Sequence, residues 1–486
     1  MKHFFDGFFT TYQNGVFIYC CAIYAIYATL TLFSYLSILA NIQKNCLREK
    51  LVLIQSSLSP GISIITGAFN EERTIIPNVR SLLTMNYPLF EVIVVNDGST
   101  DNTLEKLRAE FGLVEVKFAY HYFIQCNTVL RVFKSSDPAF SNLLVIDKLN
   151  GGNKADAINA GINASSYNYF LNTDVDCILD KDTLVHLIQP FIDDEKKVIA
   201  TGATLRMVNS CVVDAGVLIE PRIPKEILPR FQEIEYIRSF VIGKMGWNLV
   251  NCIPNVSGGL GMFDKDIVIK VGGYDRHSFG EDMDMLMRMS KYMCEQKIDY
   301  AIRYIPQSLC WTEGPSSLKV FRRQRLRWGR GLYQIFSSYY RLLFNPRYGS
   351  LGMVVLPYNF IFELCAPIIE FLGIVCYLYL IFSGLINWPY AIILLLFVYF
   401  FSIFITLLSI VWDQLVIRRY RLREVIRLCF WAFLEPLLYH PLVMIFALAG
   451  YVRQFFKIHT HWGHMERRGF GETTGPEMES LNSSAL

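Results

Sequence analysis

The chain has 486 residues, of which 52% are hydrophobic and only 18% are charged. Soluble domains carry about 25% charged residues, so this composition argues against a wholly soluble protein. The 36 phenylalanines and 27 tyrosines need an apolar environment, which excludes disorder for most of the chain. A formal net charge of +3 is far from the strongly basic character of nucleic-acid-binding domains, so no nucleic-acid partner is expected.

The N-terminal region predicts a membrane anchor. Residues 7–43 contain no Asp, Glu, Lys or Arg, and the run from Val16 to Ala40 is apolar or weakly polar throughout. A helix needs about 20 such residues to span a bilayer. The alternative, a cleavable signal peptide, has a basic start and a shorter apolar core. The sequence therefore favours a retained transmembrane anchor over residues 1–43.

A second membrane region is expected over residues 348–456. Residues 371–412 are again free of charge, which is enough for two spans, and a turn is expected at Asn387-Trp388-Pro389. We expect helices at about 360–385 and 388–412 and a last one over Leu428–Val452. Three spans result, and Tyr348–Phe362 either adds a fourth or lies flat at the interface. Residues 457–486 are expected to form an amphipathic and then disordered tail.

Basic residues predict the orientation in the membrane. Lys44, Arg48 and Lys50 follow the first helix, and a loop before the last helix contains five arginines, at positions 418, 419, 421, 423 and 427. Cytoplasmic loops carry such an excess of Lys and Arg. The pattern places residues 44–347 in the cytoplasm, on the inner face of a bacterial-type inner or plasma membrane. The side of the tail stays open. The 12 cysteines include no C-x-x-C pair, as expected for reduced thiols.

Residues 44–347 alternate short apolar runs with helical patterns. Strands are expected at Ile62–Thr66, Glu91–Val95, Leu143–Ile146 and Tyr169–Leu171, with helices between them. This alternation is typical of a parallel sheet with helices on its faces. Ligands of such sheets bind at the carboxyl ends of the strands. Polar residues follow the strands there, at Asn70, Asp97, Asp147, Asp174 and Asp176.

The strand ends carry carboxylates instead of glycine-rich phosphate loops. Neither G-x-G-x-x-G nor G-x-x-x-x-G-K-[ST] follows the first strand, which argues against an NAD enzyme and a P-loop ATPase. Carboxylates bind a diphosphate only through a divalent cation with oxygen ligands. Asp174 and Asp176 are therefore candidate ligands for Mg²⁺ or Mn²⁺, the alternative being an ordinary solvated turn.

Five short motifs follow one another across residues 60–335. They are Asn70-Glu71, Val95-Asn96-Asp97-Gly98-Ser99-Thr100-Asp101, Thr173-Asp174-Val175-Asp176, Gly280-Glu281-Asp282 and Gln324-Arg325-Leu326-Arg327-Trp328. In this order they resemble the family 2 glycosyltransferases, which have a GT-A fold. The chain is most similar to the membrane-embedded processive branch, which includes cellulose, chitin, hyaluronan and poly-N-acetylglucosamine synthases. Any one motif is weak, whereas the ordered set is specific.

The resemblance implies an α/β GT-A domain with a mainly parallel sheet, flanked by transmembrane helices. It also implies roles for individual residues. Asn70, Glu71, Asp97 and Lys154 would contact the donor, and Asp174 and Asp176 would hold the cation and the donor diphosphate. Asp282 would be the general base that removes the proton of the acceptor hydroxyl. Glu281 and Asp284 are its rivals, and all three could instead be ordinary carboxylates of a first helical turn.

The last motif lies on a basic helix at the end of the cytoplasmic block. In the family, Q-x-x-R-W marks enzymes that keep hold of a growing chain. Gln324, Arg327 and Trp328 would contact the substrates, since arginine can hold a leaving diphosphate and indole offers a flat face to a sugar. The alternative is a helix that touches anionic lipid headgroups. We expect Arg327 and Trp328 to face inward and Arg322, Arg323 and Arg330 outward.

These expectations describe an inverting membrane β-glycosyltransferase. It would transfer a sugar from a UDP-sugar, UDP-N-acetylglucosamine before UDP-glucose, to a growing cell-surface polysaccharide. Two alternatives stay open, namely a transferase that adds a single sugar to a lipid-linked acceptor and a catalytically inert transport or scaffold protein. Accessory subunits are not predictable from these motifs.

Overall fold

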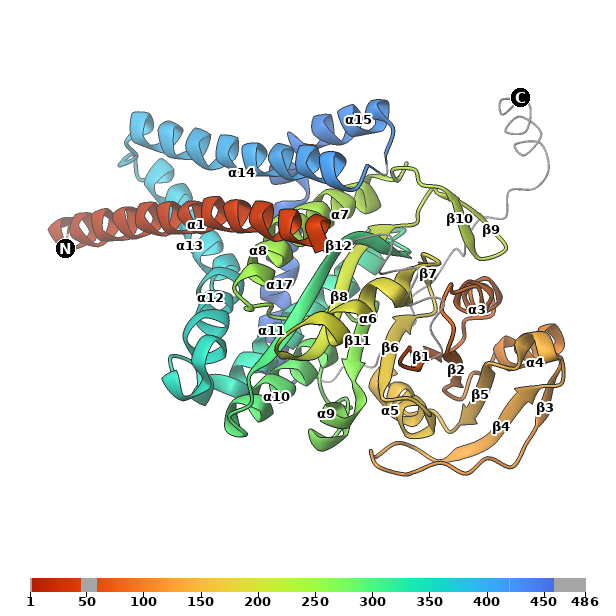
Figure 1. Cartoon of the computed structure of the whole chain (residues 1–486). Coiled ribbons are helices and arrows are strands. Elements are labelled where there is room, and N and C mark those ends of the chain that lie inside the picture. The colour runs from red at the N-terminus through yellow and green to blue at the C-terminus, as the bar shows by residue number, and fades with distance from the viewer. Residues whose placement is uncertain (1, 45–58, 419, 459–486) are drawn as a thin grey trace.

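The computed structural model describes residues 2–44, 59–418 and 420–458. A ten-stranded sheet with helices on it forms one part, and long apolar helices lie beside it (Figure 1). The expected tail falls, beyond Ile458, outside the described residues.

The centre of the sheet is parallel. Strands β1 (Ile62–Ala68), β2 (Phe90–Asn96), β5 (Leu143–Lys148) and β6 (Tyr169–Asp174) lie in the order β5-β2-β1-β6. Because both faces of this region are covered, the strands read as nearly continuous apolar runs, and the expected α/β fold is confirmed. The strands extend further toward their carboxyl ends than expected, so that Asp174 lies within β6.

Antiparallel strands complete the sheet. β11 (Leu260–Asp264) lies antiparallel between β6 and β8 (Lys197–Met207), and β12 (Tyr300–Thr312) runs parallel to β8. The short strand β7 (Cys177–Leu179) pairs antiparallel with the end of β12 and places Thr312 beside Cys177. At the opposite edge lie β3 (Leu113–Glu115) and β4 (Val129–Ser135), where the sequence predicts no strand.

Helices pack on the sheet and fix the ends of the strands. They are α3 (Ile75–Leu83), α4 (Thr103–Glu110), α5 (Lys154–Ala164), α6 (Thr183–Asp193) and α7 (Ile227–Ile237). Helix α5 lies on β1 and β2, and a Cβ added at Gly161 would stand 2.4 Å from Ile65 Cγ2. Only glycine allows this close approach, which holds Lys154, the first residue of α5, at the carboxyl edge of the sheet.

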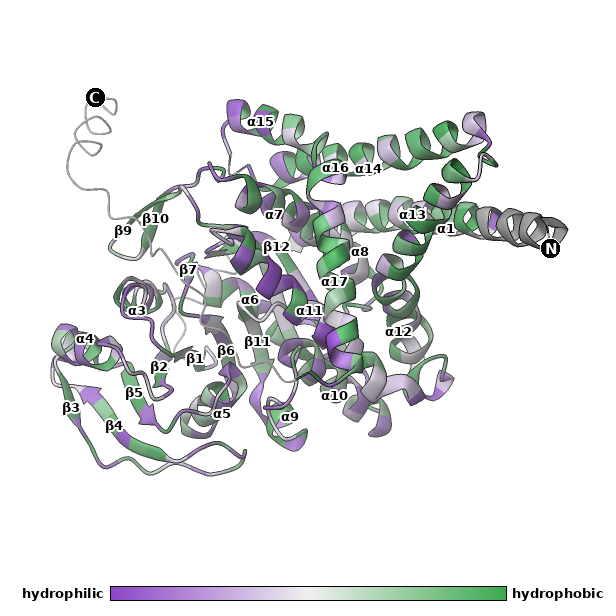
Figure 2. Ribbon diagram, turned by 180° about the vertical axis from the view of Figure 1, so that it is seen from behind, coloured by the Kyte–Doolittle hydropathy of each residue, from purple (hydrophilic) through white to green (hydrophobic). Residues whose placement is uncertain are grey.

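Four helices in the described part of the chain are long and apolar enough to cross a membrane. They cover Asn14–Asn41, Leu351–Phe382, Trp388–Val416 and Glu435–Phe455. The first belongs to α1 (Lys2–Lys44), the second ends in α13 (Ala366–Phe382), the third is α14 (Trp388–Val416) and the last ends in α17 (His440–Phe455). Hydrophobic residues dominate α13 and α14 (Figure 2).

The boundaries of the later helices differ from the expectation. Residues 351–364 are helical and form one continuous apolar stretch with α13, Leu351–Phe382, instead of a helix of their own. The expected helix Leu428–Val452 is broken, since α15 (Leu422–Ala432) ends before α16 (Glu435–Leu438) begins. Pro436 and Pro441 lack the amide hydrogen that a continuous helix needs, and each lies in the first turn of a new helical segment.

Buried ion pairs join the sheet to the membrane helices. Arg206 of β8 contacts Asp413 of α14 and lies 3.0 Å from Glu233 of α7, all three buried. Arg238 pairs with Glu435 at 3.1 Å. Separating the two parts would leave buried charges unpaired, which is costly, so these contacts favour a single arrangement.

Candidate active site

Residues after β1 and β2 form one corner of the site. Asn70 adopts a left-handed backbone conformation (φ 56°), which asparagine tolerates better than most residues. Its side-chain oxygen accepts a hydrogen bond from the Thr100 amide (2.7 Å), and the Glu71 amide donates to the Thr103 hydroxyl (2.9 Å). Asn70 and Glu71 thus stabilise, through hydrogen bonds, the loop that begins with Asp97.

Asp97 lies against a buried lysine that sequence reasoning missed. The Lys148 side chain is 0% exposed, and its ammonium contacts Asp97 and lies 2.5 Å from Asp156. The Gly151 amide also donates to Asp97 (3.0 Å). Burial raises the pKa of the Asp97 carboxyl above its ordinary value, although the Lys148 charge opposes this. Lys148 is the last residue of β5, and only the packing around it reveals that its side chain is buried.

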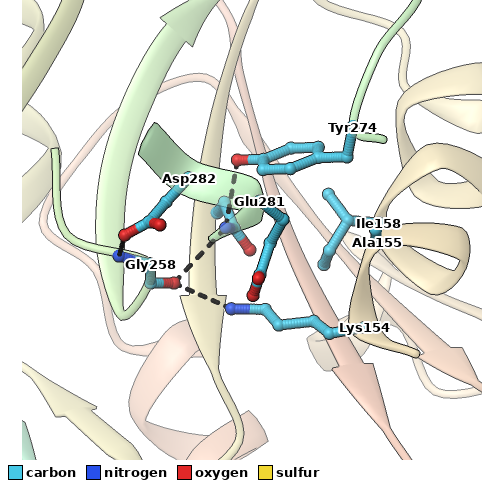
Figure 3. Close-up of a pocket in the computed structure, with 8 residues that line it drawn as sticks. Lys154, Ala155, Ile158, Gly258, Tyr274, Glu281 and Asp282 are labelled. Carbon is cyan, nitrogen blue, oxygen red and sulfur yellow. Dashed lines mark hydrogen bonds between the residues drawn. The ribbon is translucent and has the colours of Figure 1, made fainter. Parts of the chain in front are cut away.

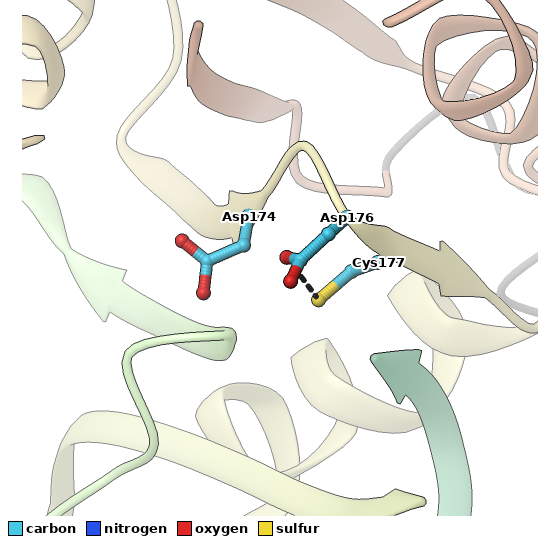
Figure 4. A group of neighbouring side chains, drawn as sticks. All are labelled: Asp174, Asp176 and Cys177. Carbon is cyan, nitrogen blue, oxygen red and sulfur yellow. Dashed lines mark hydrogen bonds between the residues drawn. The ribbon is translucent and has the colours of Figure 1, made fainter. Parts of the chain in front are cut away.

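Asp174 and Asp176 come together as predicted, beside Cys177. The ligand atoms of all three lie within 4.8 Å of one another (Figure 4). A hydrogen bond with Cys310 and burial raise the pKa of the Cys177 thiol well above its ordinary value, so the thiol stays neutral. The two carboxylates alone then offer charged ligands, and hard oxygen donors of this kind fit a divalent cation such as Mg²⁺ or Mn²⁺.

One glycine links these carboxylates to Asp282. Lys154 Nζ lies 2.5 Å from Asp174 and donates to the Gly258 carbonyl (2.7 Å). The Gly258 amide donates to Asp282 (3.1 Å), which is the second residue of α10 (Glu281–Glu295) (Figure 3). Lys154 and Asp174, the candidate donor-binding residues, therefore lie on one side of Gly258, and Asp282, the candidate base, lies on the other side.

The two rivals of Asp282 have different surroundings. Asp284 is buried on another side of α10, where it accepts a hydrogen bond from the Tyr339 hydroxyl (2.7 Å) and pairs with Arg288 (2.8 Å). These contacts give it a structural role. Glu281 lines the same pocket as Asp282, and burial raises its pKa, although Arg327, 3.8 Å away, opposes the shift.

Gln324, Arg327 and Trp328 lie on α11 (Leu318–Tyr339). Arg327 reaches toward Glu281 at the pocket, and the Gln324 amide oxygen is buried without a hydrogen-bond partner among the residues that the structure covers. Trp328 is 36% exposed and stacks on the Arg325 guanidinium, 4.4 Å from the ring centre. Arg325 itself is buried and donates to Glu235 (2.7 Å), so this charge fixes the helix.

The outward orientation expected for Arg330 is wrong. Arg322 and Arg323 are exposed, but Arg330 is buried over the Phe279 ring at 3.9 Å. The cause is the tight contact between α11 and α17, in which a Cβ added at Gly329 would stand 2.7 Å from the Ala447 carbonyl oxygen. This approach of the two helices encloses Arg330, and the sequence pattern of α11 alone does not reveal it.

Lys244 is a second buried lysine near the site. It ends the π-helical segment η2 (Arg238–Lys244), and its ammonium donates to the Asn255 carbonyl (3.1 Å) and lies 5.3 Å from the centre of the Tyr304 ring. Burial lowers its pKa from the ordinary 10.5 to about 8, although the negative charge of Asp282 opposes the shift. Asn255 belongs to the loop that carries Gly258, so Lys244 supports this loop.

The lowered pKa of Lys244 predicts a pH-dependent stability. Between pH 8 and 10.5 the unfolded chain binds a proton that the folded protein has released, so raising the pH favours the folded state. Relative to Lys244→Met, the wild type should gain about 3 kcal/mol across this window. Thermal unfolding of both proteins in detergent at pH 7 to 10.5 measures the change. A constant difference in melting temperature would contradict a neutral lysine at high pH.

The amino-acid sequence matches known families and known proteins. Residues 60–331 match the family model described as "Glycosyltransferase like family 2", and residues 236–448 match "Glycosyl transferase family group 2". A poly-beta-1,6-N-acetyl-D-glucosamine synthase of Staphylococcus epidermidis is 28% identical over 334 residues, which are 68% of this chain and 68% of that protein. Its counterpart in Staphylococcus aureus (strain COL) is 27% identical over 277 residues, 57% of this chain and 55% of that one.

Among solved structures, this chain is similar to a mannosyltransferase from Pyrobaculum calidifontis in complex with GDP-Man and Mn²⁺. It has 16% identity and a TM-score of 0.48, and the match covers 90% of this chain and 99% of that one. The family model for residues 60–331 covers more than half of the chain and includes all five of the motifs above in full. Together with the four apolar helices, this match shows that the protein belongs to glycosyltransferase family 2 and is a membrane glycosyltransferase.

Proposed function

We propose that the protein is an inverting β-glycosyltransferase that uses UDP-N-acetylglucosamine, with UDP-glucose as the second candidate, to extend a cell-surface polysaccharide. The observation that carries the proposal is the continuous set of contacts from Asp174 through Lys154 and Gly258 to Asp282. An inert scaffold has no need to keep the candidate cation ligands and a candidate base together. The poly-N-acetylglucosamine synthases among the relatives support the choice of sugar.

In this proposal Asn70, Glu71 and Asp97 form the nucleotide side of the site. Asp174 and Asp176 would hold Mg²⁺ or Mn²⁺, which neutralises the diphosphate and stabilises UDP as it leaves. The ammonium of Lys154 contacts one carboxylate, that of Asp174, and one carbonyl, that of Gly258. We propose that a donor phosphate replaces Asp174 as its anionic partner.

Asp282 takes the proton of the acceptor hydroxyl. As the acceptor oxygen attacks the anomeric carbon, the bond between that carbon and the UDP oxygen breaks, and the configuration inverts. Arg327, beside Glu281, is close enough to contact the leaving diphosphate. Gln324 offers its unpaired amide oxygen to a substrate hydroxyl.

We propose that the catalytic part lies in the cytoplasm. The polymer would leave the cell through the membrane helices. The basic residues after the first helix and before the last one support this side. The polymer would pass the membrane helices that the buried ion pairs hold against the sheet.

Trp328 is expected to keep the growing chain in place. Trp328→Ala should reduce polymer synthesis about 10-fold, the effect of losing roughly 1.4 kcal/mol of stacking, and shorten the remaining product. Release of UDP by hydrolysis of the donor should change less, because water needs no stacking surface. Trp328→Phe, which keeps a flat ring, is the control. Product sizing beside a UDP-release assay separates the two activities, and equal losses in both would contradict the role.

The donor is tested with purified protein in detergent. Each of a panel of radiolabelled UDP-sugars is incubated with the protein and with Mg²⁺ or Mn²⁺, and incorporation into product is counted. UDP-N-acetylglucosamine should be incorporated best. A preference for UDP-glucose would select the second candidate, whereas a preference for any other sugar, or no incorporation by folded protein, would show that the proposed function is wrong.

A further inference from the structure

One side of α11 continues beyond the residues assigned to the substrates. Gln324, Arg327, Gly331 and Gln334 follow one another at intervals of three or four residues, so they lie along one side of the helix. In the proposed function Gln324 and Arg327 contact the substrates. Gly331 and Gln334 have no role in it, although both contact residues 277–280, the segment that leads into α10.

Gly331 lies against the backbone of this segment. A Cβ added at Gly331 would stand 2.9 Å from the Gly280 nitrogen and 3.0 Å from its Cα. These neighbours are backbone atoms, which cannot move aside as the end of a flexible side chain can. Glycine at position 331 therefore lets α11 approach the residue that precedes α10.

Gln334 binds the same segment about one turn further along α11. Its Oε1 accepts a hydrogen bond from the Phe279 amide (3.0 Å), and its Nε2 donates to the His277 carbonyl (3.0 Å). One side chain thus pairs a donor and an acceptor of a backbone segment that belongs to no helix or strand. Backbone polar groups outside regular structure need such partners, so the two bonds fix residues 277–279 on α11.

Arg330 adds a contact from α17. Its guanidinium lies 3.9 Å from the centre of the Phe279 ring, and its Nε donates to the Gln454 amide oxygen (3.2 Å). A cation over an aromatic face is attracted by the ring. The segment is therefore held against two packed helices, α11 and α17.

The orientation of Asp282 depends on where α10 begins. Gly280 is the N-cap residue of α10 and has no side chain that could cap the helix. Asp282 Oδ1 accepts a hydrogen bond from the Met283 amide (2.8 Å), and its Oδ2 accepts one from the Gly258 amide (3.1 Å). A shift of residues 277–280 would move this first turn, and the carboxylate would move with it.

We propose that Gly331 and Gln334 are positioning residues for the general base, Asp282. They hold the preceding segment on α11 and thereby keep the carboxylate aligned with the acceptor hydroxyl. The inference rests on the proposed function, because it takes Asp282 to be the base. One helix then sets the position of the base relative to Arg327, which contacts the leaving diphosphate. A displacement of about 1 Å in a reacting geometry can lower the rate about 100-fold.

Gln334→Met tests the two hydrogen bonds with a side chain of similar size. In the purified full chain, kcat for incorporation from UDP-N-acetylglucosamine should fall about 10-fold, because the base loses its alignment. The KM for this donor and the affinity for UDP should stay within about twofold, since the donor contacts lie elsewhere. The melting temperature should change little, because Gln334 is only half-buried.

Gln296→Met is the matched control. Gln296 is exposed at the other end of α10, so the same replacement there should leave kcat and KM unchanged. If Gln334→Met keeps the kcat of the wild type, or weakens donor binding as much as it lowers kcat, Gln334 does not position the base.

Gly331→Ala tests the close approach of the two backbones. The added methyl group must push α11 away from Gly280, so kcat should fall about 100-fold in protein that still binds UDP. Binding of UDP to the same preparation shows that the variant is folded. A folded Gly331→Ala protein with normal kcat would overturn this inference and leave the proposed function intact. A folded wild type that incorporates no sugar would overturn the proposed function itself.

Discussion

Asp282→Asn is expected to abolish sugar transfer while the affinity for the UDP-sugar stays within about twofold of wild type. The amide has nearly the same shape but cannot accept the proton of the acceptor hydroxyl. Loss of a general base lowers the rate about 10² to 10⁴-fold. Donor binding should persist because the proton leaves only in the transition state. Polymer formation and equilibrium binding of the donor, measured on the same preparation, separate the two effects.

The neighbouring carboxylates provide the controls for this experiment. Glu281→Gln changes a residue of the same pocket, which pairs with Arg327, and should weaken the enzyme without abolishing transfer. Asp284→Asn touches only structural contacts with Tyr339 and Arg288 and should act on stability. If Asp282→Asn keeps near-normal turnover and Glu281→Gln does not, Glu281 is the base.

Asp176→Asn is expected to lower turnover about 10³-fold at a standard metal concentration, and EDTA should abolish the activity of the wild type. The substitution removes one of the two charged ligands while keeping the size of the side chain. Hard cations such as Mg²⁺ and Mn²⁺ depend on carboxylate charge, so the affinity for the metal should fall. The metal concentration needed for half-maximal activity measures this directly.

Two variants check that the loss comes from the cation site. Cys177→Ser should retain the metal dependence, because the thiol is neutral and contributes no charge. Asp182→Asn removes a half-buried carboxylate between β7 and α6 whose side chain accepts a hydrogen bond from Asn86 (3.0 Å), and it should be neutral. Full activity of the wild type in EDTA would contradict a metal-dependent mechanism.

The strands and most of the carboxylates could be predicted because they depend on local pattern. A parallel strand buried on both faces is a continuous apolar run, as in β2 and β5, and its end is marked by the first polar residues. Asp97, Asp174 and Asp176 follow such runs, so their common edge follows from the fold class alone. The structure confirms that Asp174 and Asp176 lie together.

Other features depend on contacts between distant segments. Lys148 and Lys244 look like ordinary lysines in the sequence, and only packing reveals that they are buried. Arg330 is enclosed because Gly329 meets Ala447 of α17, far along the chain. The unpaired oxygen of Asn172 appears only once Gly258 and Tyr274 have taken its amide hydrogens. A buried polar atom without a hydrogen-bond partner can be recognised only in the three-dimensional structure.

The most direct test is the product made by the purified wild type from UDP-N-acetylglucosamine and Mg²⁺. Mass spectrometry should show a long ladder of masses separated by one N-acetylhexosamine residue, and nuclear magnetic resonance should show β linkages. Asp282→Asn should give no ladder. Addition of a single sugar to a lipid, an α-linked product, or no product from folded wild-type protein would contradict the account.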